Sequence, residues 1–334
     1  MTTVKGLRLG VTLFSFTSEY HGREYSLDQL LEKVAVLGLG PGVELVGFSH
    51  VRGFPNTTDE FADRFKSLMG RLGLEQSCLG INADIFLDPN KPMTADESLA
   101  YHTLQVETAA KLGFPVARYQ FLAGPDVIRR LLPTAERLNV KLGLEIHAPH
   151  KVDSPEVMEY REMYEKENSP YLGFIPDFGA SATAISPAYL RFVRNLGMPE
   201  GLISLVQEVW QQPDNPDRPH GKHEDFVKRA ADAGFAKENL SECFMAFGLF
   251  SRMEPERWLE IMPQIVHIHG KFHDIDEKGE VPGIPYEKIL PVFVEGGYNG
   301  YMSSEWEGHF FSDEPGFPKV QAHHALAKRI LGRA

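Results

Sequence analysis

The chain of 334 residues has little cysteine, no long apolar run and no surplus of basic residues. Its two cysteines, Cys78 and Cys243, are too few for a disulfide framework, so we expect both to be small buried side chains. No segment approaches the roughly 18 apolar residues of a membrane-spanning helix. The net charge of −12, with no stripe of Lys or Arg, opposes binding to a phosphate backbone. We therefore expect neither a membrane nor a nucleic acid as partner.

The first 16 residues have only a faint likeness to a secretory signal. Lys5 and Arg8 precede a short apolar stretch, but polar residues interrupt it and no cleavage site of small residues follows. We therefore predict that this segment is the first strand of the fold and that the protein is soluble and cytoplasmic.

The composition is that of a folded globular protein, with 43% hydrophobic and 24% charged residues. Strand and helix patterns alternate along the chain, which is typical of a parallel sheet. Eight segments are predicted strands: residues 7–16, 43–48, 74–81, 116–121, 140–147, 172–178, 264–272 and 301–307. Helical patterns follow them at residues 26–37, 58–72, 94–112, 125–138, 155–166, 187–195, 286–295 and 319–331.

Eight strand–helix units predict an α/β protein with a single (β/α)₈ TIM barrel over residues 1–334. Roughly 42 residues per unit are enough for a strand, a helix and their loops. An open doubly wound sheet is the alternative, but it usually carries a glycine-rich phosphate turn after the first strand, and residues 16–21 have none. Residues 196–257 contain helical patterns without a convincing strand. We therefore predict a helical insertion between the sixth and seventh strands.

Each of the last four predicted strands ends in a residue that can bind a metal ion: Glu145, Asp177, His269 and Glu305. The carboxyl ends of all strands meet at one rim of a TIM barrel, where active sites lie. Side chains alternate along a strand, so His147 shares the face of Glu145, and His267 that of His269. We expect these side chains to point together into the barrel mouth.

Ionisable groups that converge in this way repel one another or stay unpaired unless a cation holds them. Taken singly, each residue has a plainer interpretation: a strand-end carboxylate is often a helix cap, and His267 with His269 could form a polar layer. Together, three carboxylates and one imidazole predict a site for a hard divalent cation. We expect Mn²⁺, with Mg²⁺, Co²⁺, Fe²⁺ or Zn²⁺ as substitutes.

The order Glu–Asp–His–Glu on consecutive strands resembles the xylose isomerase-like superfamily of sugar isomerases and epimerases. The tail HIHGKFHDIDEKGEVPGIPYEKILPVFVEGGYNGYMSSEWEGH, residues 267–309, is especially similar to that superfamily. This tail and two further stretches, LGLGPGVELVGFSHVRGFP (37–55) and LGLEIHAPH (142–150), resemble the alpha subunit of the bacterial C-glycoside deglycosidases. The superfamily likeness spans nearly the whole chain.

Two departures narrow the resemblance. Ketohexose epimerases of the superfamily carry a histidine three residues beyond the strand-six aspartate, where this chain has Ala180. The repair endonucleases of the superfamily need further metal ligands and a basic surface, which the net charge of −12 opposes. A metal-dependent sugar isomerase or epimerase stays the alternative. A non-catalytic binding protein on the same barrel is less favoured, because a pure binder needs no metal ligands.

The deglycosidase resemblance implies a metal-dependent carbon–carbon lyase. Its substrate would be a 3-keto glucoside of an aromatic aglycone, oxidised beforehand by a separate enzyme. Loss of the C2 proton would give an enediolate, and the aglycone would leave from C1 by β-elimination. In the epimerases two metal-bound glutamates share the proton transfer, and these match Glu145 and Glu305.

His147 is the predicted general base, since it lies beside Glu145 and imidazole titrates near neutral pH. Alternatively it only orients Glu145. Lys271 and His273 could polarise a sugar oxygen or protonate the leaving aglycone, or could simply face solvent at the rim. Four further residues are predicted sugar contacts: His50, Arg52, Tyr119 and Gln120.

The resemblance also implies a small beta subunit, packed on the barrel in a hetero-oligomer. Leu202, Leu205 and Val206 recur at helical spacing within the insertion and are candidate contacts for that subunit. The alternative is that these apolar side chains pack over the barrel rim.

Overall fold

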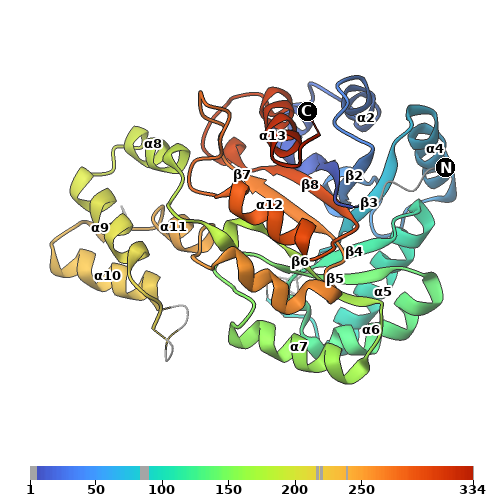
Figure 1. Ribbon diagram of the computed structural model, residues 1–334. Helices are drawn as coiled ribbons and strands as arrows, with labels where there is room; N and C mark the ends of the chain where they lie inside the picture. The colour runs from blue at the N-terminus through green and yellow to red at the C-terminus, as the bar shows by residue number, and fades with distance from the viewer. Residues whose placement is uncertain (1–5, 83–89, 216–217, 219–220, 238–239, 334) are drawn as a thin grey trace.

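In the computed structural model, which describes residues 6–82, 90–215, 218, 221–237 and 240–333, eight strands form one sheet (Figure 1). Their bounds are β1 Arg8–Thr12, β2 Gly42–Val46, β3 Glu75–Gly80, β4 Val116–Tyr119, β5 Lys141–Ile146, β6 Leu172–Pro176, β7 Ile268–Phe272 and β8 Tyr301–Trp306. Neighbouring strands pair in parallel in the order β6-β5-β4-β3-β2-β1-β8-β7.

The two ends of this sheet meet between β6 and β7. They are joined by isolated parallel bridges, from Phe174 to Ile265 and from Asp177 to His269, instead of a continuous ladder. The result is a nearly closed (β/α)₈ barrel, which confirms the predicted fold and excludes the open doubly wound sheet.

Helices cover the outside of the barrel (Figure 1). Those at the predicted helical patterns are α2 Leu27–Val36, α4 Asp59–Leu72, α5 Ala95–Leu112, α6 Pro125–Leu138, α7 Pro155–Glu167, α12 Tyr286–Glu295 and α13 Gly316–Ile330. At the start of α5, the Thr94 hydroxyl accepts a hydrogen bond from the Glu97 amide, and the Glu97 carboxylate accepts one from the Thr94 amide. In the described part of the chain, no helix combines the length and the apolar run that crossing a bilayer requires.

Several strands are shorter than the sequence predicts, because short helical turns take up their ends. β1 ends at Thr12, whose side chain accepts a hydrogen bond from the Phe14 amide and begins the 3-10 helix η1 (Leu13–Phe16). β7 begins only at Ile268: the 3-10 helix η5 (Pro255–Gln264) includes the first residue of the predicted strand, and Ile265 pairs with Phe174 only through an isolated bridge. Other short turns are α1 Thr17–His21, α3 Gly47–His50, η2 Phe121–Ala123, η3 Phe178–Ser181 and η6 Gly308–Phe310.

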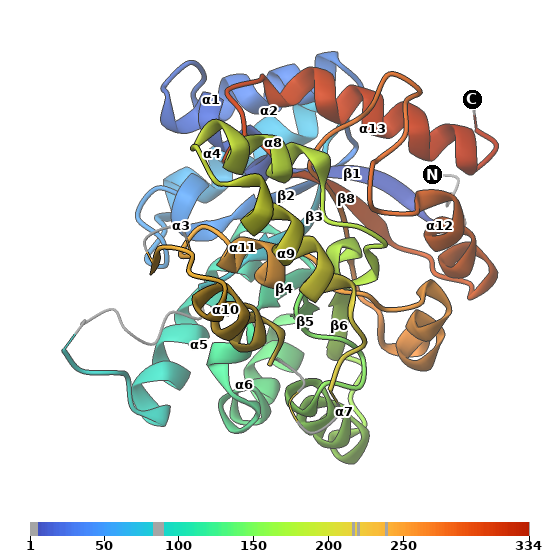
Figure 2. The same ribbon diagram turned by 90° about the vertical axis from the view of Figure 1, so that its left-hand side faces the viewer.

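α8 Pro187–Asn195 lies at the helical pattern predicted after the sixth strand. Beyond it, the described residues form the helices α9 Glu200–Gln211, α10 Lys222–Asp232 and α11 Phe244–Gly248, at the place of the predicted insertion. Figure 1 shows them as a lobe beside the barrel, and in Figure 2 they lie in front of the strands. The ring of Phe250, just after α11, lies 4.8 Å from the ring of His273, just after β7. The lobe therefore lies over the carboxyl rim of the barrel.

The apolar side chains singled out in the insertion pack inward. Leu202 and Val206 are buried in the main hydrophobic core, and Leu205 packs against the same core. Leu202 and Val206 are therefore not a surface for a partner subunit, and they follow the alternative from the sequence, which is packing within the molecule; Leu205 is half-buried.

Candidate metal centre and barrel mouth

The four predicted ligands converge at the carboxyl rim. Glu145 and His269 lie on β5 and β7, Glu305 lies on β8, and Asp177 directly follows β6. All four are buried, and one ligand atom from each lies within 4.8 Å of the ligand atoms of the other three. We call these four residues the metal centre, because such a group could hold a metal ion.

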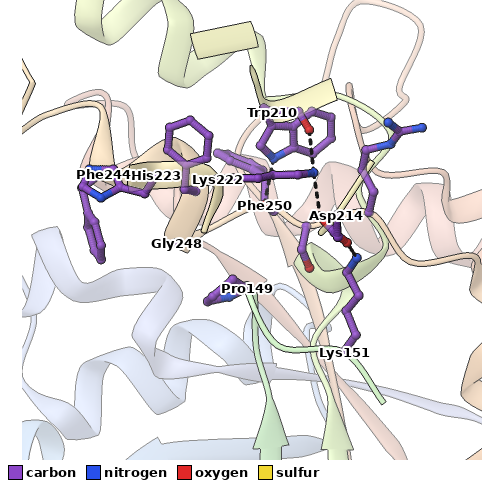
Figure 3. Close-up of a pocket in the computed structure, with 12 residues that line it drawn as sticks. Pro149, Lys151, Trp210, Asp214, Lys222, His223, Phe244, Gly248 and Phe250 are labelled. Carbon is purple, nitrogen blue, oxygen red and sulfur yellow. Dashed lines mark hydrogen bonds and ion pairs between the residues drawn. The ribbon is translucent and has the colours of Figure 1, made fainter. Parts of the chain in front are cut away.

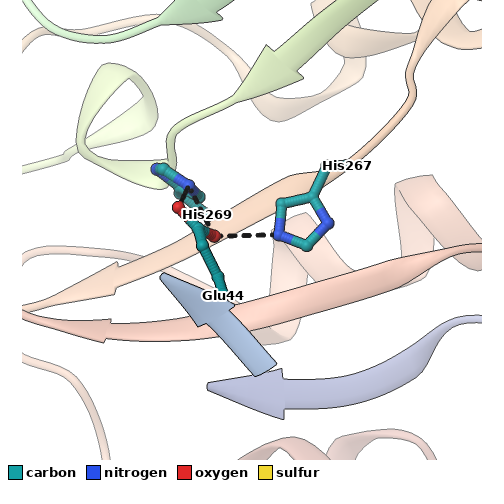
Figure 4. Close-up of side chains that lie close together, drawn as sticks. All are labelled: Glu44, His267 and His269. Carbon is teal, nitrogen blue, oxygen red and sulfur yellow. Dashed lines mark hydrogen bonds and ion pairs between the residues drawn. The ribbon is translucent and has the colours of Figure 1, made fainter. Parts of the chain in front are cut away.

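His269 uses both ring nitrogens within this cluster. Its Nδ1 lies 2.6 Å from Oε1 of Glu145 and 3.3 Å from Oε2 of Glu305. Its Nε2 lies 3.0 Å from Oε1 of Glu44, a buried carboxylate on β2 that also contacts Nε2 of His267 at 3.1 Å (Figure 4). A carboxylate on the second nitrogen of a ligating histidine fixes the orientation of the ring. The geometry therefore suits Nδ1 as the ligand and Glu44 as the group that positions it.

Two permanent cations lie among the carboxylates. Nη1 of Arg118, on β4, lies 2.9 Å from Oε2 of Glu145. Nζ of Lys271 lies 2.6 Å from Oδ2 of Asp177 and 3.2 Å from Oε1 of Glu307. Buried carboxylates here outnumber the permanent cations five to two: Glu44, Glu145, Asp177, Glu305 and Glu307 against Arg118 and Lys271.

This excess of negative charge shifts the titration of the buried groups. Burial lowers the pKa of His269, but the carboxylates of Glu305, Glu44 and Glu145 outweigh it and raise that pKa well above its usual range. Burial raises the pKa of Glu305, and the cations His269 and Lys271 offset this only in part. The raised pKa of His269 reflects a shortage of positive charge between these carboxylates, whereas the raised pKa of Glu305 reflects its burial first.

A divalent cation fits this shortage. In the part of the chain that the structure describes, Oδ2 of Asp177 and Oε2 of Glu305 are buried and accept no hydrogen bond of good geometry. The other Asp177 oxygen, Oδ1, accepts a hydrogen bond from the Gly179 amide at 2.7 Å, so Oδ2 is the oxygen that lies 2.6 Å from Nζ of Lys271. Three carboxylates and one imidazole form an oxygen-rich donor set that suits a hard cation.

A cavity of about 260 Å³ lies at the barrel mouth beside the metal centre. Its described lining consists of Phe14, Val46, Phe48, Ile81, Asn82, Arg118, Gln120, Glu145, His147, Glu305 and Glu307. Of the predicted catalytic and sugar-binding residues, Glu145, Glu305, His147 and Gln120 are therefore at this cavity. Nδ1 of His147 contacts the carbonyl oxygen of Ala148, which holds the ring at the rim.

Tyr119 does not line this cavity, because it points to the opposite face of β4 from Arg118. Its hydroxyl contacts that of Tyr164 on α7, and its ring is fully buried between the barrel and that helix. Tyr119 and Gln120 were both predicted sugar contacts, but neighbouring residues of an extended chain point to opposite faces, so only Gln120 lines the cavity. Arg118 lines the same cavity.

The remaining predicted contacts lie away from the described lining of the cavity. His50 is buried in α3, with Nδ1 3.2 Å from the Val46 backbone, and Arg52 is exposed beyond it. Lys271 lies on β7 itself, and His273 lies just after it. Both are buried against Glu307, so neither is the solvated rim residue that the sequence left open.

Three functional side chains were missed from the sequence: Glu44, Arg118 and Glu307. Glu307 could have been predicted from the alternation of side chains along a strand, since it lies two residues beyond Glu305 and thus on the same face. Arg118 directly precedes Tyr119, so the opposite choice of face would have found it. Glu44 gave no signal, because it stands alone in the apolar segment Val-Glu-Leu-Val and its partner His269 is 225 positions away.

Relatives with assigned names match almost the entire chain, although no family model matches it. The chain is 40% identical to the 3'-dehydrocarminate deglycosidase alpha subunit of Microbacterium sp., over 99% of this chain and 97% of that protein. It is 39% identical to a C-glycoside deglycosidase alpha subunit of Arthrobacter globiformis, over 97% of this chain and 91% of that protein.

Solved structures with the same fold include sugar epimerases. L-ribulose 3-epimerase has a TM-score of 0.58 at 12% identity, covering 98% of this chain and 95% of that one. A D-allulose 3-epimerase from Methylomonas sp. has a TM-score of 0.56 at 10% identity, covering 99% of this chain and 100% of that one. At this identity the likeness supports the fold alone, whereas the sequence relatives define the family. The chain belongs to the family of the C-glycoside deglycosidase alpha subunits.

Proposed function

We propose that this chain is the catalytic alpha subunit of a metal-dependent C-glycoside deglycosidase. It would cleave the carbon–carbon bond of 3-oxo-C-glucosides, which makes it a lyase. The observation that carries the proposal is the convergence of Glu145, Asp177, His269 and Glu305 on one point, in a chain whose relatives have deglycosidase names.

The metal centre supplies the ligands for a divalent cation, which we propose to be Mn²⁺. Mg²⁺, Co²⁺, Fe²⁺ and Zn²⁺ are the substitutes that the same donors would accept. When bound, the cation would polarise the ketone and hydroxyl oxygens of the sugar and so make the proton on C2 more acidic.

The proton on C2 would pass to His147, whose side chain lines the cavity beside Glu145. The electron pair of the C–H bond then forms the enediolate between C2 and C3. Glu145 and Glu305, which line the same cavity, are the alternative bases. A base in hydrogen-bond reach of the proton is the geometric requirement, and all three side chains lie at this cavity.

Elimination would follow from the enediolate. The C3 ketone re-forms, a double bond forms between C1 and C2, the bond from C1 to the aglycone breaks, and the aglycone carbon takes up a proton. The step needs no oxidant, because C3 was oxidised beforehand. Lys271 and His273 are buried against Glu307, so we assign them to holding that carboxylate at the cavity.

We further propose that a small beta subunit completes the enzyme in a hetero-oligomer, since the relatives are named alpha subunits. The cytoplasmic location stays a prediction from the sequence.

A direct comparison of substrates tests the function. The purified, Mn²⁺-loaded protein, alone and with its co-expressed partner subunit, is assayed with a 3-keto C-glucoside and with free ketoses. We expect release of the aglycone from the glucoside and no interconversion of the ketoses. Epimerisation of a free ketose without cleavage of the glucoside would replace the lyase by the isomerase or epimerase alternative.

A further inference from the structure

A second pocket, of about 270 Å³, lies between the insertion and the loop after β5 (Figure 3). Aromatic rings form much of its wall: Trp210, Phe244, Phe247 and Phe250 from the insertion, with the imidazole of His223. His223 packs against Phe244 with ring centroids 5.1 Å apart. Such flat, apolar walls suit a planar aromatic molecule.

Basic groups predominate among the charged side chains that line this pocket in the described part of the chain. Lys151, Lys222 and Arg252 face one carboxylate, Asp214. Nζ of Lys222 lies 2.8 Å from Oδ1 of Asp214, and Nζ of Lys151 contacts Oδ2 of the same residue. In Figure 3 both amines point to Asp214, and Lys222 also reaches the Trp210 carbonyl oxygen, at 3.0 Å. We call these side chains and the aromatic wall the aromatic–cationic pocket.

Burial and neighbouring cations together lower the pKa values of the two amines. Burial, followed by the charge of Lys222, lowers the pKa of Lys151 to about 8. Burial, followed by the charge of Arg252, lowers the pKa of Lys222 to about 8. In a protein with a net charge of −12, this lining holds three cations that repel one another, Lys151, Lys222 and Arg252, against the single carboxylate of Asp214. A ligand that brings a negative charge would relieve that repulsion.

Two links along the chain and between side chains place the aromatic–cationic pocket near the barrel mouth. Phe250 lines the pocket, and its ring also packs 4.8 Å from that of His273, which contacts the cavity-lining Glu307. Pro149 lines the pocket, and His147, two residues earlier, lines the barrel mouth. In a C-glycoside the aglycone ring is joined directly to C1 of the sugar. An aglycone must therefore lie in the first space beside the sugar that can accept a flat ring.

We infer that the aromatic–cationic pocket is the aglycone subsite and that it selects aromatic aglycones carrying an anionic group. The rings of Trp210, Phe244 and Phe250 would stack on the aglycone, and Lys151 and Lys222 would pair with its negative charge. This inference rests on the proposed deglycosidase function. It adds that the charge of the aglycone, and not only its shape, determines which glycosides this chain accepts.

Binding of two matched probes tests the charge selectivity without turnover. The Mn²⁺-loaded enzyme with its partner subunit is titrated by calorimetry with 2-naphthoate and with its uncharged analogue 2-naphthamide. We expect about tenfold tighter binding of 2-naphthoate, since hydrogen bonds to charged groups are the stronger kind. Lys222→Gln should abolish that preference. The matched control is Lys228→Gln on the same helix, whose exposed side chain pairs with Asp232 and should keep the preference.

A second pair of ligands tests the assignment to the aglycone. With 3-keto C-glucosides that differ only in an aglycone carboxylate or carboxamide, Lys222→Gln should raise KM about tenfold for the carboxylate alone. Equal affinity for the two naphthalene probes overturns the charge selectivity. A naphthoate preference with no change in the KM ratio overturns the aglycone assignment. If the wild type cleaves neither glucoside, the proposed function fails, while the naphthalene titration still decides what the pocket binds.

Discussion

The barrel mouth and the aromatic–cationic pocket are neighbours with opposite chemistry. The metal centre consists of buried carboxylates and an imidazole on or next to strands β5 to β8. The aromatic–cationic pocket consists of aromatic rings and basic groups, most of them on the insertion helices and their loops. Strand ends hold side chains at fixed mutual distances, which a metal ion needs, whereas helices over a rim tolerate changes of size and charge. Under the proposed function, the barrel would carry the reaction chemistry and the insertion would choose the substrate.

The strongest test of this division is to remove one ligand of the metal centre. Glu305→Ala should reduce turnover by about 10³-fold or more, because the cation stabilises charge that develops on the sugar oxygens. Dialysis of the wild type against a chelator should have the same effect, and added Mn²⁺ should restore activity. Glu295→Ala, an exposed carboxylate on α12, serves as the control. Full activity of Glu305→Ala would assign the chemistry to another site.

The second test separates the base from the metal ligands within the barrel mouth. His147→Gln should keep the fold and the bound metal and lose about 10²–10⁴-fold in cleavage rate, as is usual when a general base is removed. Exchange of the C2 hydrogen with deuterated solvent, followed by NMR, should fall in parallel. The exposed His21→Gln provides the control. If exchange persists while aglycone release falls, His147 acts on the leaving group and a glutamate is the base.

The third test measures how much Glu44, inside the barrel, contributes to the metal affinity of the metal centre. Glu44→Gln keeps the shape of the side chain but weakens its hold on Nε2 of His269. Metal affinity should fall about 10–100-fold, the usual cost of losing the partner of a ligating histidine. Titration with Mn²⁺ measures this, with the exposed Glu75→Gln on β3 as control. An unchanged affinity would show that packing alone positions His269.

The mildest test uses pH and should affect only the aromatic–cationic pocket. The pKa of Lys151 and of Lys222 is lowered to about 8, so both amines are mostly charged at pH 7 and lose their protons as the pH rises. Affinity for 2-naphthoate should therefore fall about tenfold per amine between pH 7 and 9, while 2-naphthamide shows no such trend. The charged groups around these amines are Asp214, Asp153, Arg252 and Arg257. A flat profile for 2-naphthoate would mean that the amines do not hold the probe.

The sequence by itself determined the barrel and the metal centre, and both for the same reason. Alternating strand and helix patterns imply parallel strands, and a closed parallel barrel brings every strand end to one rim. Glu145, Asp177, His269 and Glu305 could therefore be placed together without any contact being known. The resemblance to the xylose isomerase-like superfamily followed from the same residues and from the tail at 267–309, and the resemblance to the deglycosidase alpha subunits from that tail with residues 37–55 and 142–150.

Only the tertiary structure decided which side chains face inward on short strands. It also decided which residues far apart in the chain come into contact. Residue spacing could not choose between Arg118 and Tyr119, because in a strand of four residues both faces are buried, one by the barrel interior and one by α7. Glu44 reaches His269 only because β2 and β7 belong to one closed barrel. The aromatic–cationic pocket depends on how the insertion packs over the rim. The spacing of apolar residues predicts each helix but not how the helices pack onto a barrel.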